Sequence, residues 1–115
     1  MFHMLTCFDL KPEVGIEAFS AAYADFVMYM RGTDLVDSTG PIGRRQSDTK
    51  MDTDAERRHE YFVILSFRDR AQVDAAYAHL KPHEEPAESA HKAVYSKVRN
   101  PVFICWQDVE QIEPL

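Results

Sequence analysis

Three segments of the chain are apolar on both alternations, which is the pattern of strands buried on both faces of a sheet. They are residues 2–8 (FHMLTCF), 59–67 (HEYFVILSF) and 102–108 (VFICWQD). In the first segment, the even-numbered side chains share one face and the odd-numbered side chains, which include His3, share the other. We therefore expect strands over these three ranges, with Asn100-Pro101 breaking the chain just before the last one.

Two long stretches and one shorter stretch have the spacing of amphipathic helices. The first stripe runs from Ile16 to Met30, and we expect its helix to open at Lys11-Pro12-Glu13 and to stop at Gly32. The second stripe runs from Val73 to Leu80. Asp69 and Gln72 form a predicted capping box before it, and Pro82 ends it. The third covers residues 86–98.

The remaining segments have a weaker secondary-structure pattern. Residues 35–46 contain strand-forming residues, but Gly40, Pro41 and Gly43 interrupt them. Because proline cannot donate to a ladder, this strand is predicted at a sheet edge or with a bulge. Residues 47–58 are polar and charged throughout, which predicts a long, mobile hairpin connection.

The resulting order is β-α-β-β-α-α-β, in one domain over residues 1–115. This order predicts an α+β, ferredoxin-like split βαβ fold with a four-stranded antiparallel sheet. The two long helices cover one face of the sheet. The other face is apolar as well, so it needs a cover, and a second copy of the chain supplies it. We therefore expect a homodimer that packs two sheets face to face as a dimeric α/β barrel.

Composition narrows the class of partner. Thirteen basic and nineteen acidic residues give a net charge of −6, which disfavours nucleic acids and anionic membranes. No apolar run is long enough to span a membrane, and no signal peptide is visible at the N-terminus. Cys7 and Cys105 lie in apolar segments and are expected to be reduced and buried, which indicates a cytoplasmic protein.

Candidate chemistry centres on Tyr77, His83 and His3. Tyr77 lies on the stripe of the second long helix, His83 just beyond that helix and His3 in the first strand. All three can line one cavity between helix and sheet, where a hydroxyl and an imidazole would bind a carbonyl or phenol and move a proton. The alternative is that Tyr77 fills the core and anchors its hydroxyl on a histidine. His91, on the stripe of the third helix, is assigned to the same pocket, with simple packing as its alternative.

A metal site can also be drawn from His79, His83 and His91 together with Glu84, Glu85 or Glu88, because imidazoles and carboxylates are acceptable ligands. Pro82 interrupts the helix between His79 and His83, and the spacing matches no familiar ligand motif. We therefore expect no metal. No other cofactor motif is present, so no cofactor is expected either.

The chain resembles the stress-responsive A/B-barrel (Dabb-type) proteins of the dimeric α/β-barrel superfamily. The resemblance rests on an early histidine in the first strand (His3), on Phe67-Arg68-Asp69, and on the six-residue step from Tyr77 to His83. Leu80-Lys81 stands where that family often has His-Pro. A member of the family uses a tyrosine and a histidine at this spacing for an aldol cyclisation of a polyketide. The resemblance thus implies that Tyr77 and His83 form an acid–base pair and that His3 is a pocket residue.

Three hypotheses of function follow. The first is a homodimer that binds a small apolar or aromatic molecule in a helix–sheet pocket, with or without cyclase- or isomerase-like chemistry. The second is a non-catalytic module that senses a ligand or responds to stress. The third is a cofactor-independent or haem-type monooxygenase of the same superfamily. The haem-degrading type uses a strand tryptophan and asparagine, whereas Trp106 here lies in the last strand.

Overall fold

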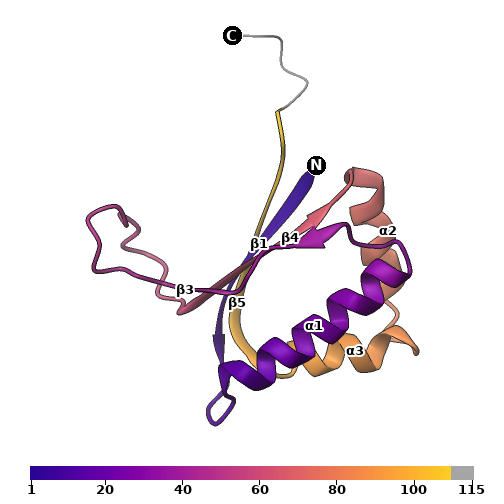
Figure 1. The fold of residues 1–115 in the computed structure, drawn as a ribbon, viewed down its shortest axis with the longest axis horizontal. Helices are drawn as coiled ribbons and strands as arrows, with labels where there is room; N and C mark the ends of the chain where they lie inside the picture. Colours follow the sequence, from indigo (N-terminus) through magenta and orange to yellow (C-terminus); the bar gives the residue numbers. More distant parts are fainter. Residues whose placement is uncertain (110–115) are drawn as a thin grey trace.

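The structure is a computed structural model that describes residues 1–109; residues 110–115 of the predicted domain lie outside the described part. An antiparallel sheet of five strands carries its three helices on one face (Figure 1). The elements are β1 (Phe2–Leu10), α1 (Ile16–Gly32), β2 (Ser38–Thr39), β3 (Gly43–Arg44), β4 (Tyr61–Phe67), α2 (Arg70–Leu80), α3 (Ala87–Tyr95) and β5 (Val98–Gln107). The predicted α+β, ferredoxin-like class is therefore confirmed.

Strand β1 is central in the sheet and pairs with β4 on one side and with β5 on the other. Leu5 lies opposite Ile64 in β4 and opposite Ile104 in β5. Residues opposite each other in an antiparallel sheet share a face, so these three side chains all point the same way. The even-numbered residues of β1, from Met4 to Phe8, point to the other face, toward the helices.

The helix face holds the core. Phe8 and Met30 are almost fully buried there, together with Phe19 and Tyr23 of α1. The Phe8 ring lies 4.6 Å from the Phe19 ring and 5.6 Å from the Tyr61 ring. The apolar stripe of α1 thus packs on the inward side of the central strand, as its spacing predicts.

The opposite face of the sheet is also apolar, and none of the helices within residues 1–109 covers it. Ile64, Val102, Ile104 and Trp106 are exposed by 37%, 37%, 38% and 40% on this open face. Large apolar side chains lying together at this exposure mark an association surface.

Several boundaries differ from the sequence-based expectation. Helix α1 begins at Ile16, because Lys11–Val14 form a turn in which Glu13 has a φ of 70°. The single edge strand predicted over residues 35–46 is split at Pro41 into β2 and β3, and both pair with β4.

Helix α3 ends at Tyr95, and β5 already begins at Val98, so Asn100-Pro101 lies inside a strand and does not precede it. β5 is an edge strand, where proline is tolerated, and a register shift between Cys7 and Asp9 of β1 absorbs the irregularity.

Asp69 caps the start of α2 as predicted, whereas the second bond of the predicted capping box is made one residue earlier, to Arg68. The Asp69 carboxylate accepts a hydrogen bond from the Gln72 backbone N–H at 2.9 Å, and the Gln72 side chain accepts one from the Arg68 N–H at 2.7 Å. Gln72 also donates to the Asp34 carbonyl at 3.1 Å, which ties α2 to the end of α1. This cap fixes the direction in which α2 leaves the sheet.

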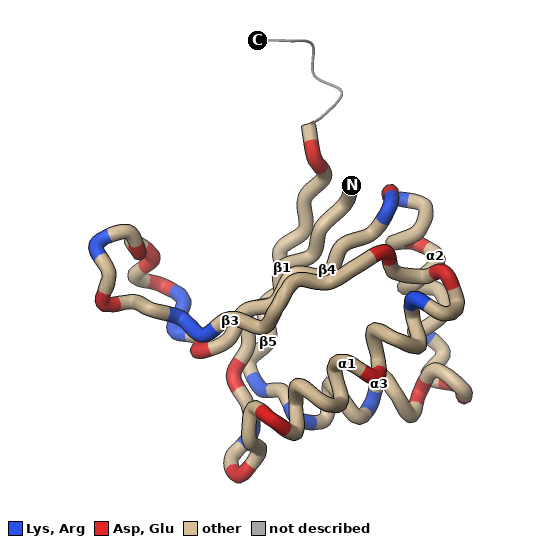
Figure 2. The backbone as a smooth tube through the Cα atoms, in the orientation of Figure 1, with Lys and Arg blue, Asp and Glu red and all other residues tan. Residues whose placement is uncertain are grey.

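The 47–58 connection projects from the sheet on the side away from the helices and carries a dense mixture of both charges (Figure 2). Arg45 organises it: its guanidinium donates to both Asp52 carboxylate oxygens at 2.7 and 2.8 Å and to the carbonyls of Asp54 and Arg57. The connection is thus folded on itself by charged hydrogen bonds.

None of the helices within residues 1–109 is long and apolar enough to cross a membrane.

Candidate functional site

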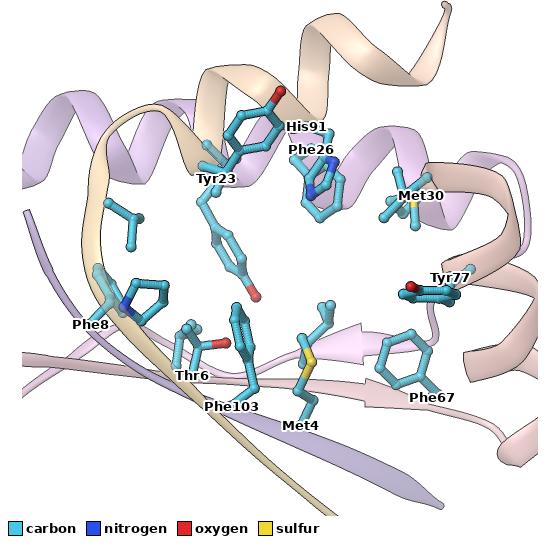
Figure 3. Close-up of a pocket in the computed structure, with 18 of the residues that line it drawn as sticks. Met4, Thr6, Phe8, Tyr23, Phe26, Met30, Phe67, Tyr77, His91 and Phe103 are labelled. Carbon is cyan, nitrogen blue, oxygen red and sulfur yellow. The ribbon is translucent and has the colours of Figure 1, made fainter. Parts of the chain in front are cut away.

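A cavity of about 270 Å³ lies between the helices and the sheet (Figure 3). β1, β4 and β5 supply one wall, with Met4, Phe67 and Phe103 among its residues, and α1, α2 and α3 supply the other. The cavity wall is almost entirely apolar. Ala76 of α2 is buried in the cavity wall, and its small side chain leaves part of this space unfilled. A pocket of this kind suits the apolar body of a small organic molecule.

The mouth of the cavity is marked by lining residues that are themselves exposed. Tyr77 is 67% exposed, Phe103 58% and Tyr95 40%, and they come from α2, β5 and α3. Figure 3 shows the Tyr77 hydroxyl turned toward the space, beside the ring of Phe67. Within residues 1–109 this hydroxyl has no hydrogen-bond partner, so it is free to meet a ligand.

Tyr23, which also lines the cavity, has a structural role. It is buried, and its hydroxyl is 2.7 Å from the Thr39 hydroxyl. Burial raises the pKa of Tyr23 above its usual value, since the phenolate would lie among apolar side chains. Tyr23 therefore stays neutral and anchors α1 to β2.

His91 brings an imidazole to the cavity wall from α3. Its ring stacks on Phe26 at 5.4 Å and meets the Tyr95 ring edge-on at 4.8 Å. Its Nδ1 is buried and has no hydrogen-bond partner within residues 1–109. Burial lowers the pKa of His91, although the nearby Glu88 carboxylate opposes the shift. His91 is therefore neutral near pH 7.

His83 lies behind His91, outside the cavity wall. Its ring centroid is 6.3 Å from that of His91, and its Nδ1 lies 3.0 Å from a carboxylate oxygen of Glu88. The Tyr95 hydroxyl donates to the other oxygen of Glu88 at 3.2 Å. The structure thus brings His83 and His91 together, whereas of the predicted pair Tyr77 and His83 only Tyr77 lines the cavity.

The expectation that His3 shares this cavity is corrected by the structure. His3 is an odd-numbered residue of β1 and points to the open face, where its strand partners are Ser66 and Trp106. Its Nδ1 lies 2.7 Å from the Ser66 hydroxyl, and its Nε2 lies 2.9 Å from an Asp108 carboxylate oxygen. The alternation of the strand separates His3 from Tyr77 by the thickness of the sheet.

The structure also separates some of the predicted metal-ligand candidates from the others. His79 is hydrogen-bonded to Tyr29: the Tyr29 hydroxyl lies 2.7 Å from the His79 Nε2. Glu85 accepts hydrogen bonds from the backbone and side chain of Ser89 at the start of α3. Only His83, Glu88 and His91 converge, with one ligand atom from each lying within 4.8 Å of the others.

The sequence analysis assigned His91 to this pocket but named Glu88 only as one of three alternative carboxylate ligands. Glu88 and His91 are three residues apart on α3 and therefore share a helix face, a spacing that indicates a pair. Tyr95 lies one further turn along the same face. The step that the sequence does not reveal is the folding of His83 back onto them, which depends on its left-handed backbone, with a φ of 55°.

Comparison with solved structures shows the same fold. The Arabidopsis thaliana protein At3g17210 is 14% identical, with a TM-score of 0.71, over 96% of this chain and 97% of that chain. A dimeric ferredoxin-like protein of unknown function from Jannaschia sp. CCS1 is 15% identical, with a TM-score of 0.63, over 93% and 98%. An antibiotic biosynthesis monooxygenase is 17% identical, with a TM-score of 0.59, over 95% and 99%.

At these identities the similarity concerns the fold alone. No curated protein matches the sequence. The model of one protein family matches residues 1–112, nearly the whole chain. The chain therefore belongs to the family of unknown function DUF6614.

Proposed function

We propose that this protein is a cytoplasmic homodimer that binds a small apolar or aromatic organic molecule in the helix–sheet cavity of each subunit. The observation that carries the proposal is the cavity itself: about 270 Å³, with an apolar wall and an unpaired Tyr77 hydroxyl at its mouth. Apolar contact supplies affinity, and a few placed polar groups orient the ligand.

The dimer is part of the proposal because no helix of residues 1–109 covers one apolar face of the sheet. A second copy of the chain presents the same apolar face and can bury it with two-fold symmetry. Solved relatives of the same fold from Jannaschia sp. CCS1 and Bacteroides fragilis are dimeric ferredoxin-like proteins, which favours this arrangement. We also retain the relation to the stress-responsive A/B-barrel proteins as a hypothesis.

A second candidate function adds acid–base chemistry to binding. The Tyr77 hydroxyl can donate a hydrogen bond to a ligand carbonyl, while the cluster of His83, Glu88 and His91 supplies the basic group, with His91 in the cavity wall. The base would take a proton from the carbon next to the carbonyl, giving an enolate whose oxygen accepts the Tyr77 hydrogen bond, and return a proton to that carbon. The competing hypothesis is a binding module without catalysis.

One experiment with 2-tetralone, a bicyclic ketone, tests both ligand binding and acid–base catalysis. We expect saturable binding by calorimetry and, in D₂O with a chelator present, faster deuterium exchange at the carbon next to the carbonyl. Ala76→Leu fills the cavity and should abolish both signals. Ala75→Leu, on the exposed side of the same helix, should change neither. Tyr77→Phe should keep binding and lose about tenfold or more of the exchange rate.

The outcomes separate the hypotheses. Equal binding by wild type and Ala76→Leu, or no binding of any apolar ketone or phenol, contradicts the cavity proposal. Binding without accelerated exchange supports the non-catalytic module and removes the acid–base candidate.

A further inference from the structure

His83, Glu88 and His91 form a compact group at the edge of the cavity, on the side that α3 provides. A ring nitrogen of each histidine and a carboxylate oxygen all lie within 4.8 Å of one another. We propose that these three side chains bind a divalent first-row transition metal ion, with Zn²⁺ as the expected ion. The proposal does not depend on the proposed function, because it concerns the ion alone.

The local fold explains why the three side chains meet. Glu88 and His91 are separated by three residues on α3, so they stand one turn apart on the same helix face. His83 lies in the turn that follows α2, where its N–H bonds the Leu80 carbonyl at 3.1 Å and its φ is 55°. This left-handed residue reverses the chain and returns its imidazole to Glu88.

The donor set has the chemistry of a metal site. Two imidazoles and one carboxylate are the ligands of several catalytic zinc sites, and a Glu-x-x-His step on a helix recurs in metal-binding bundles. Imidazole binds metal through a ring nitrogen, and the buried Nδ1 of His91 has no hydrogen-bond partner within residues 1–109. Glu88 supplies a negative charge that offsets part of the charge of the ion.

The surrounding groups are arranged to orient the ligands. The Tyr95 hydroxyl donates to one oxygen of Glu88 at 3.2 Å, and the His83 Nδ1 lies 3.3 Å from that oxygen and 3.0 Å from the other. Such hydrogen bonds to a ligating carboxylate usually strengthen metal binding. Ligand atoms around tetrahedral Zn²⁺ are roughly 3.4 Å apart, given metal–ligand bonds of roughly 2.1 Å. The 57% exposed His83 side chain can rotate to close the remaining gap.

The competing account is a hydrogen-bonded cluster with no ion. In that case the His83–Glu88 contact at 3.0 Å is a surface ion pair, which contributes little to stability. The two accounts differ in what Zn²⁺ does to the purified protein.

The test is titration of the full-length, chelator-treated protein with Co²⁺, followed by visible absorption, and with Zn²⁺, followed by calorimetry. We expect one ion per chain and displacement of Co²⁺ by Zn²⁺. His91→Phe, Glu88→Gln and His83→Asn should each weaken Zn²⁺ binding by about tenfold or more. Asparagine is chosen at position 83 because it tolerates a positive φ.

His79→Ala is the matched control. It removes an exposed histidine of α2 that bonds Tyr29 and lies outside the cluster, so Zn²⁺ affinity should not change. The proposal is overturned if wild type shows no saturable binding. It is equally overturned if the three cluster variants, shown to be folded by circular dichroism, bind Zn²⁺ as tightly as wild type or no more weakly than His79→Ala. Ketone binding, measured separately with chelator, reports on the cavity and not on this site.

Discussion

Two histidines lie on opposite sides of the sheet, His3 in β1 and His91 in α3, and have opposite surroundings. His3, on the open face, has both ring nitrogens occupied, one by Ser66 and the other by Asp108. His91, on the cavity face, stacks between aromatic rings, and its Nδ1 has no partner within residues 1–109. A histidine with both nitrogens bonded serves the fold, whereas one with a free nitrogen is available for a ligand or an ion.

The same contrast extends to the two faces as wholes. The helix face is packed around Phe8 and Met30 but leaves a cavity toward α2 and α3. The open face presents exposed apolar side chains of β4 and β5 together with the His3–Ser66–Asp108 group. The first arrangement suits a small molecule and the second suits a large flat partner.

Substitution of Ile104 by lysine should have the largest effect, because it tests the open face directly. Burying an unpaired ammonium in each half of a symmetric interface should weaken the dimer by more than about 100-fold. Analytical ultracentrifugation over a range of protein concentrations measures this. Met28→Lys, at a 70% exposed position on α1, should leave the assembly unchanged. A wild-type protein that sediments as a monomer at micromolar concentration would contradict the face-to-face dimer.

Replacing His3 or His91 by phenylalanine should lower the free energy of unfolding by unequal amounts. His3→Phe leaves the buried Ser66 hydroxyl without its partner and should lower the free energy of unfolding by about 1–3 kcal/mol. His91→Phe keeps the ring contacts with Phe26 and Tyr95 and should change it by less than about 0.5 kcal/mol.

Urea unfolding at one protein concentration, with chelator present, makes this comparison. Equal losses for the two variants would show that hydrogen-bond pairing does not distinguish the two sites.

The smallest effect on stability is expected from a substitution at Asp54, in the charged 47–58 connection. Hydrogen bonds from the Arg57 side chain and from the Glu56 and Arg57 backbone lower the pKa of Asp54 from 3.8 to about 2. A carboxyl whose pKa is lowered by folding stabilises the protein above its unfolded pKa and loses that contribution as the pH falls toward the folded pKa.

Wild type should therefore melt slightly above Asp54→Asn at pH 6, and the difference should shrink between about pH 4 and pH 2. Thermal melts of both proteins across this range measure the effect, and Asp48→Asn, in the same connection, serves as control. A difference that is constant with pH would show that Asp54 acts as a polar group and not as a charge.

Most of the fold was predictable because it rests on local and periodic signals. The three apolar strands, the long stripe of α1 and the Asp69–Gln72 cap each depend on residues close together in the chain. The boundaries that were predicted wrongly, at Lys11, Pro41 and Asn100-Pro101, are those where pairing with a distant strand or turn outweighs the local preference.

The site was predictable only in part. Tyr77 was placed at the cavity by helix periodicity, and His91 by the stripe of its helix. His3 was placed on the wrong face, although the alternation of β1 already separated it from Met4 and Phe8. His3 was grouped with Tyr77 because its strand was expected to be central beneath the helix, but a central strand presents alternate side chains to opposite faces.

The sequence by itself determined the order of elements, the two apolar faces of the sheet and the helix face shared by Glu88 and His91, because these follow from strand and helix periods. Only the tertiary structure decided which imidazoles meet. His83 joins His91 through a chain reversal at a left-handed residue, and His3 joins Asp108 through pairing of the first and last strands. Such meetings depend on long-range packing, which no local pattern of residues encodes.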